Sequence, residues 1–157
     1  MIEFSDSQLM LYKKGKTMRF NINLLFNQGL CETAFAFYQS VLGGQNSYGY
    51  IRYGDVPEMV EQTLSPEQAA YVFYTELAFE HFILRGQDEL DGVTLSSQPN
   101  TLVNIDTEDT EEGQRIFAAL SAQGESLFPL QTISPDMMYG KLIDRFGIAW
   151  EVLVHTQ

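Results

Sequence analysis

Hydrophobic and polar positions follow two kinds of pattern along this chain, one with a period of two residues and one with a helical period. Residues 19–26 alternate between apolar and polar side chains, which predicts a strand. Residues 31–42 then carry apolar side chains three and four positions apart, and Gly43 and Gly44 close the segment, which is typical of a helix and its end. The chain therefore begins its regular part with a strand followed by a helix.

The rest of the chain repeats this order, and a polar, glycine-containing turn joins its last two strands. The predicted elements are a tyrosine-rich strand at 45–53, a loop or broken helix at 55–68, a hairpin at 71–79 and 82–85, a strand at 101–106, a helix at 110–123 capped by Thr110, a strand at 127–133 and a hairpin at 138–154. A strand-helix-strand-strand-strand unit thus recurs at a spacing of about eighty residues, which indicates an internal repeat.

Two such βαβββ units predict an α+β fold in which mixed sheets curl around a cleft, with the helices outside. We expect an N-terminal extension at 1–17 and a single domain at 18–154, made of module one (18–90) and module two (98–154). The extension is either a short added strand or a loosely held segment. Exposed strand edges in this arrangement favour a homodimer.

The charge of the chain narrows the classes of partner. The formal net charge is −12, and four of the nine basic residues (Lys13, Lys14, Lys16 and Arg19) lie within the first twenty positions. Such an acidic body repels phosphate backbones and anionic membranes, so we expect no nucleic-acid or membrane partner. The chain has no apolar stretch long enough to span a bilayer and no apolar signal core, which predicts a cytoplasmic protein.

Two segments of the chain carry a family resemblance. One is the helix segment Glu-Thr-Ala-Phe-Ala-Phe-Tyr-Gln-Ser-Val-Leu-Gly-Gly at 32–44, and the other is Tyr139-Gly140 followed by Asp144-Arg-Phe-Gly147 and Trp150-Glu151. Together they resemble the vicinal oxygen chelate superfamily of glyoxalases, bleomycin-resistance proteins and dioxygenases. Within it, residues 18–154 resemble the PhnB-like branch, often labelled 3-demethylubiquinone 3-methyltransferase-like.

The resemblance implies a divalent metal held mostly by His and Glu side chains of the first and last strands of each module. Glu151 matches the last-strand ligand, whereas the other three positions fall at Asn21, Arg85 and Asn100. Tyr74 stands where PhnB-like sequences often have a histidine. Amide oxygens are weak ligands for transition metals, and a cation opposes a divalent ion. We therefore expect no resident cofactor, with a divalent metal at Glu151 as the alternative.

Glu151 is the first candidate for catalysis, because a carboxylate in an apolar strand needs a partner, a metal or a pocket. It is either a metal ligand or general base, or one half of an ion pair with Arg85. Tyr74 and Glu76 share a strand face and form the second catalytic candidate. With Tyr139, they either orient a substrate hydroxyl or carbonyl or pair across strands.

Asparagines are depleted in strands, so the four near the two first strands suggest a pocket for a neutral polar ligand. Some of them are otherwise edge-exposed or cap turns. The predicted ligand-binding residues are Asn21, Asn23, Arg85, Asn100, Asn104 and Tyr139.

Other chemistry is less well supported. His81 and His155 lie at a turn and at the C-terminus, where neither predicts a triad or a histidine metal site. Cys31 is the single cysteine and is either activated by a helix N-terminus or a small buried hydrophobic residue. Gly43 and Gly44 end a helix instead of opening one, so no methyl-donor site is predicted.

The sequence thus predicts a PhnB-like protein that binds a small polar metabolite in the inter-module cleft, without a tightly held catalytic metal. The alternatives are a metal-dependent lyase, isomerase or dioxygenase of glyoxalase type that uses Glu151, and an interaction module whose cleft is filled by its own side chains. Whether the protein is an enzyme stays open at this point.

Overall fold

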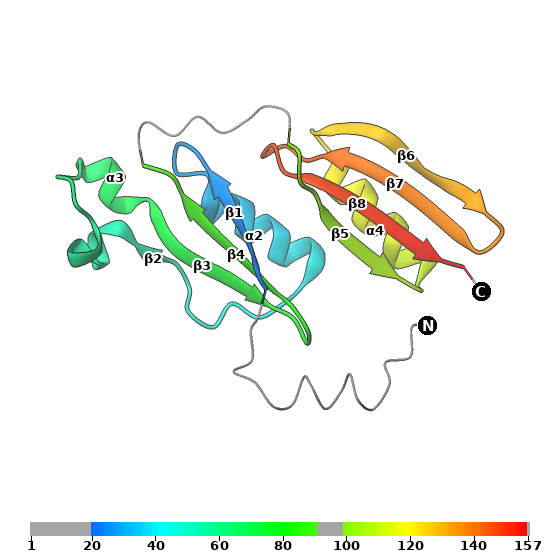
Figure 1. The fold of residues 1–157 in the computed structure, drawn as a ribbon, viewed down its shortest axis with the longest axis horizontal. Coiled ribbons are helices and arrows are strands. Elements are labelled where there is room, and N and C mark those ends of the chain that lie inside the picture. The colour runs from blue at the N-terminus through cyan, green and yellow to red at the C-terminus, as the bar shows by residue number, and fades with distance from the viewer. Residues whose placement is uncertain (1–19, 91–98, 157) are drawn as a thin grey trace.

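The computed structural model describes residues 20–90 and 99–156, which form two modules of the same topology (Figure 1). The predicted extension at 1–17 lies outside the described residues. Module one contains β1 (Ile22–Phe26), α2 (Cys31–Leu42), β2 (Ile51–Arg52), the 3-10 turns η1 (Tyr53–Asp55) and η2 (Pro57–Met59), α3 (Pro66–Ala70), β3 (Val72–Ala78) and β4 (Ile83–Asp88). Module two contains β5 (Val103–Thr107), α4 (Thr110–Ser121), β6 (Glu125–Ser134), β7 (Met137–Ile143) and β8 (Ala149–His155).

Each module has a four-stranded mixed sheet, with the strand order β1-β4-β3-β2 in module one and β5-β8-β7-β6 in module two. The first strand of each module pairs in parallel with the last, and the other pairs are antiparallel. The crossover between these parallel strands contains the helix, as a parallel connection requires. The α+β class with two βαβββ modules is therefore confirmed.

Several predicted bounds differ from the structure by a few residues, and three differences have a clear local reason. The tyrosine-rich strand at 45–53 shrinks to β2, and Gln45 makes only an isolated bridge to Ala78. The cap of α4 is Asp109 and not Thr110, because the Asp109 carboxylate accepts a hydrogen bond of 3.0 Å from the Glu112 amide. Strand β4 continues three residues past Arg85 to Asp88, since its pairing with β1 holds it in the sheet.

One continuous hydrophobic core joins the two modules, and it includes five buried residues of helix α2. The Tyr38 ring of α2 lies 5.3 Å from the Trp150 ring of β8, and the Phe37 ring lies 5.8 Å from the Phe146 ring. Helix α2 therefore packs against the sheet of module two as well as against its own sheet.

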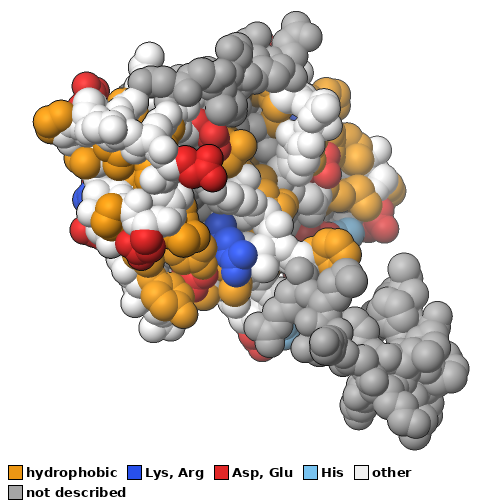
Figure 2. Space-filling model, turned by 60° about the vertical axis from the view of Figure 1, so that its left-hand side comes forward, with side chains coloured by type: hydrophobic (Ala, Val, Ile, Leu, Met, Phe, Trp, Pro, Cys, Tyr) orange, Lys and Arg blue, Asp and Glu red, His pale blue; other side chains and the backbone are white. Residues whose placement is uncertain are grey.

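The surface agrees with the acidic composition. Figure 2 shows separate acidic side chains scattered among hydrophobic and neutral ones, with few basic side chains on this face. None of the described helices is long and apolar enough to cross a membrane.

Candidate functional site

The sheet of each module has one face against its helix and one face that carries polar side chains, which we call the open face. Gly86 faces the helix, because a Cβ there would meet the Phe35 ring of α2, so its neighbours in β4 point to the open face. The strand register places three open-face residues of each module directly opposite one another. These rows are Asn23, Arg85 and Glu76 in module one, and Asn104, Glu151 and Lys141 in module two.

Glu76 and Arg85 are the central groups of the open face of module one. The Tyr74 hydroxyl donates a hydrogen bond to Glu76, whose exposed fraction is only 6%. Burial, together with this bond and the neighbouring charge of Glu76, raises the pKa of Tyr74, so the phenol stays protonated. The Arg85 guanidinium lies 5.7 Å from the centre of the Tyr74 ring, and its Nε is buried without a hydrogen-bond partner among the described residues. Both charged groups therefore keep unused hydrogen-bonding capacity.

Glu151 is the central group of the open face of module two. It accepts hydrogen bonds from the Asn104 amide nitrogen at 2.9 Å and from the Tyr139 hydroxyl at 3.2 Å. Desolvation and the bond to Glu151 raise the pKa of Tyr139, which holds this hydroxyl as a donor. Tyr139 and Tyr74 occupy equivalent positions in β7 and β3, so each module presents a tyrosine hydroxyl bonded to a carboxylate.

The expected ion pair between Arg85 and Glu151 is not made within the chain. None of the ion pairs among the described residues includes either side chain. The two residues instead occupy equivalent positions, opposite Asn23 in one sheet and opposite Asn104 in the other. The sequence did indicate that the two residues are equivalent in the repeat, but equivalent residues need not be in contact.

The other predicted residues divide between the two modules. Asn21 lies directly before β1, and Asn23 donates a hydrogen bond of 2.8 Å to Gln87 on the open face. Asn100 is exposed ahead of β5, where its carbonyl oxygen accepts a bond from the neighbouring Thr101 hydroxyl at 3.1 Å. No single cleft gathers all of these amides within one chain, according to the contacts of the described residues.

The open faces also contain Gln87 and Lys141, which were not among the residues predicted from the sequence. Each follows a predicted residue by two positions on the same strand, Gln87 after Arg85 and Lys141 after Tyr139. Because side chains alternate along a strand, this spacing was the signal that would have found them.

The largest difference from expectation concerns Asp144, in the turn between β7 and β8. This carboxylate is 3% exposed and accepts four hydrogen bonds. The donors are the Tyr38 hydroxyl at 2.6 Å, the Trp150 Nε1 at 2.9 Å, and the amides of Phe146 at 2.8 Å and Ile148 at 3.0 Å. Tyr38 belongs to module one, so Asp144 joins the two modules. The Asp-Arg-Phe-Gly turn, which carries much of the family resemblance, therefore serves the packing of the fold.

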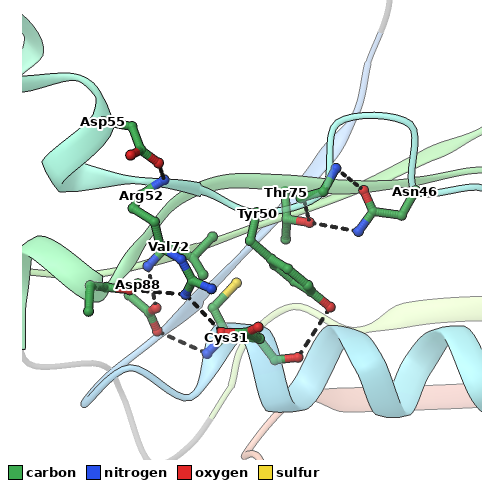
Figure 3. A network of polar contacts seen from close by, with 11 residues as sticks. Cys31, Asn46, Tyr50, Arg52, Asp55, Val72, Thr75 and Asp88 are labelled. Carbon is green, nitrogen blue, oxygen red and sulfur yellow. Dashed lines mark hydrogen bonds and ion pairs between the residues drawn. The ribbon is translucent and has the colours of Figure 1, made fainter.

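A second buried carboxylate, Asp88, orders the start of α2 (Figure 3). Its two oxygens accept the backbone amides of Cys31 and Val72, at 2.9 and 2.8 Å, so it ties together the end of β4 and the starts of α2 and β3. Burial raises the pKa of Asp88. The Cys31 thiol is fully buried, and burial and the charge of Asp88 raise its pKa, so it is a small core residue and not an activated nucleophile.

The donor set does not fit a transition-metal site within one chain. Glu151 is bonded to an amide and a phenol, and the described residues contain no group of three His, Cys, Asp or Glu side chains placed to hold one ion. Transition metals in proteins are held mainly by imidazole, thiolate and carboxylate. The described residues of the open face of module two therefore do not form a transition-metal site within one chain.

Fold and site together define a protein of the glyoxalase and bleomycin-resistance fold whose first and last strands carry polar open faces. The chain belongs to the PhnB-like branch of the vicinal oxygen chelate superfamily, since the family described as 3-demethylubiquinone-9 3-methyltransferase matches residues 18–153. Protein YjdN of Escherichia coli (strain K12) is 29% identical over 135 residues, which cover 82% of this chain and 90% of that protein.

Solved structures show the same fold. A crystal structure of a protein from Pseudomonas aeruginosa is 23% identical with a TM-score of 0.73, and it covers 88% of this chain and 100% of its own. A PhnB protein from Bacillus cereus is 20% identical with a TM-score of 0.70, over 89% and 100% of the two chains. A glyoxalase/bleomycin resistance protein/dioxygenase family enzyme from Burkholderia phytofirmans is 15% identical with a TM-score of 0.51, over 86% and 96%.

Proposed function

We propose that this protein binds a small polar metabolite on the open faces of its two modules, without a tightly held catalytic metal. The observation that carries the proposal is the unused hydrogen-bonding capacity of the charged groups on the open face of module one. Glu76 and Arg85 are opposite each other in the strand register, and the Arg85 Nε is buried without a hydrogen-bond partner, yet no ion pair joins the two side chains among the described contacts. Buried polar groups gain most from a partner that completes their hydrogen bonds, which favours a ligand with both donors and acceptors.

The two rows also support a homodimer, because their charges are inverted. Position for position, module one carries Arg85 and Glu76 where module two carries Glu151 and Lys141. If module one of one copy faces module two of another, Arg85 faces the partner's Glu151 and Glu76 faces the partner's Lys141. Such complementarity steers association and sets its register. The metabolite would then lie between open faces of two different copies.

A charge exchange tests the dimer. Replacing Arg85→Glu is expected to weaken self-association about tenfold or more, because like charges then face each other across the interface. The combined variant Arg85→Glu with Glu151→Arg restores opposite signs and is expected to recover most of the loss. Sedimentation velocity over a dilution series measures both. Equal dissociation constants in all variants would rule out facing open faces.

Metabolite binding is tested by thermal unfolding against a panel of polar metabolites, with metal analysis of protein purified without chelator. We expect no stoichiometric metal, and a raised midpoint with at least one metabolite, since a ligand at a hundredfold excess over its Kd adds about 2.7 kcal/mol. Glu151→Gln is expected to abolish the shift. The matched control Glu111→Gln, in the exposed first turn of α4, is expected to retain it.

The second candidate function is a metal-dependent lyase, isomerase or dioxygenase of glyoxalase type that uses Glu151. The proposed dimer favours it, because facing modules would bring Glu76 and the partner's Glu151 into one site, which supplies two carboxylates instead of one. Stoichiometric metal that disappears in Glu151→Gln would favour this function over the first.

We do not propose methyl transfer, although the family description names that reaction. An adenosine-carrying methyl donor is usually bound at a glycine-rich turn that opens a helix. Here Gly43 is the cap at the end of α2, and the turn into α2 contains a single glycine, Gly29. The arrangement therefore gives this chemistry no support.

A further inference from the structure

A cavity of about 370 Å³ lies between the modules, and Asn104 is the one residue of the two open-face rows that lines it. Every residue of β5, from Val103 to Thr107, lines it. The other six lining side chains are all apolar, and they are Leu42, Phe79, Phe82 and Leu84 from module one with Ile116 and Trp150 from module two. The cavity is therefore a groove with one strand along its length and apolar walls.

The strand that lines this groove has a free edge. In the sheet order β5-β8-β7-β6, β5 pairs with β8 on one side and with no described strand on the other. A free edge offers unpaired amide and carbonyl groups, and beside apolar walls it suits an added extended segment. The groove therefore suits an extended segment that pairs with β5 as a further strand.

We propose that residues 9–14 of the chain's own N-terminal segment add to the free edge of β5 as a parallel strand. The family match begins at residue 18, so residues 1–17 lie outside the matched region. Within residues 1–17, Leu-Met-Leu-Tyr at 9–12 is an uninterrupted apolar run. In an extended segment Leu9 and Leu11 point to the same side, where the walls of the groove would receive them.

Charge sets the direction of the added strand. Lys13 and Lys14 directly follow the apolar run. The end of β5 and the turn beyond it are acidic, with Asp106, Glu108 and Asp109. A parallel strand places the lysines beside these acids, whereas an antiparallel strand would carry them to the opposite end of the groove. Opposite charges at close range favour the parallel arrangement.

The chain is long enough to make this connection. Ile22 at the start of β1 pairs with Leu84, which lines the groove. Figure 1 shows the start of β1 and the end of β5 at the same lower edge of the molecule. The six residues from Gly15 to Phe20 span up to about 20 Å when extended, and Gly15 permits a reversal of direction. The segment can therefore reach β5 of its own chain and cover an edge that otherwise invites association.

Hydrogen exchange of the full chain tests the proposal. The variant Leu9→Asp with Leu11→Asp is expected to exchange the amides of 103–107 at least about tenfold faster than the unchanged chain, because the edge loses its cover. The matched control Ile2→Asp with Phe4→Asp alters two apolar residues of the same segment outside the docked run, and is expected to leave exchange unchanged. The chain's single tryptophan, Trp150, lines the groove, so its emission should change with the first variant and not with the control.

A second pair of variants tests the charge argument. Lys13→Gln with Lys14→Gln is expected to speed exchange of the same amides, whereas Ser5→Glu with Ser7→Glu, which shifts the net charge equally, is not. Adding a synthetic peptide of residues 5–17 to the Leu9→Asp, Leu11→Asp variant is expected to restore protection. Equal exchange in all variants would overturn the proposal. Protection that falls on dilution would also overturn it, since it would assign the groove to a second copy.

Discussion

Replacing Asp144 by alanine is expected to lower the free energy of unfolding by about 3–5 kcal/mol, a large part of the stability of a domain of this size. The substitution leaves the Tyr38 hydroxyl and the Trp150 Nε1 buried without the acceptor that both now share. It also removes the acceptor of the Phe146 and Ile148 amides that shapes the turn. Chemical denaturation monitored by Trp150 fluorescence measures the loss.

Two controls separate this role from a general effect of removing a carboxylate. Glu61→Ala removes an exposed carboxylate and is expected to change stability by less than about 0.5 kcal/mol. Tyr38→Phe keeps the ring and removes one donor, so we expect a smaller loss of about 1–2 kcal/mol. A loss in Asp144→Ala no larger than that in Tyr38→Phe would contradict the assignment of Asp144 as the junction of the modules.

Replacing Gly86 by alanine is expected to cost about 2–4 kcal/mol and to weaken ligand binding with it. An added Cβ would lie 2.2 Å from Cε2 and 2.6 Å from Cζ of Phe35, a ring with no exposed surface. Since the ring is enclosed by the core, α2 must move away from the sheet. Gly86 lies between Arg85 and Gln87 in β4, so the movement would also displace the open face of module one.

A double-mutant cycle tests whether the contact between the new methyl group and Phe35 causes this loss of stability. Phe35→Leu alone removes ring volume and leaves a cavity, whereas combined with Gly86→Ala it makes room for the new methyl group. The combined loss of stability is therefore expected to be smaller than the sum of the two single losses, by about 1 kcal/mol or more. Strictly additive losses would show that the contact between Gly86 and Phe35 does not limit the packing.

Much of the fold was predictable because its signals are local. The helix at 31–42 has the same bounds in the prediction and in the structure, since its apolar spacing and the closing glycines lie within the segment itself. The tyrosine-rich stretch at 45–53 was not predictable in the same way. Its β propensity is real, but only Ile51 and Arg52 find a partner strand, and strand formation requires that partner.

The strand face on which the candidate residues lie was predictable, whereas their contacts were not. Alternation along the strands placed Asn23, Glu76 and Glu151 on open faces, as the register shows. The hydrogen-bond partners of Glu151 were not predictable in this way. The overlay of the two modules aligned it with Arg85, but aligned positions in a repeat lie on different sheets, and the hydrogen bonds of Glu151 go to Asn104 and Tyr139.

The βαβββ repeat, the closing hairpin and the polar positions along the strands follow from the sequence alone, because hydrophobic period, turn residues and helix ends depend on neighbouring positions. The contacts of the carboxylates, in contrast, depend on how the modules pack. Tyr38 and Asp144 are 106 positions apart, and nothing local to either predicts their bond. Packing of α2 against module two brings them together. Burial then makes the loss of that bond costly, and the same holds for the polar contacts of the buried Glu76.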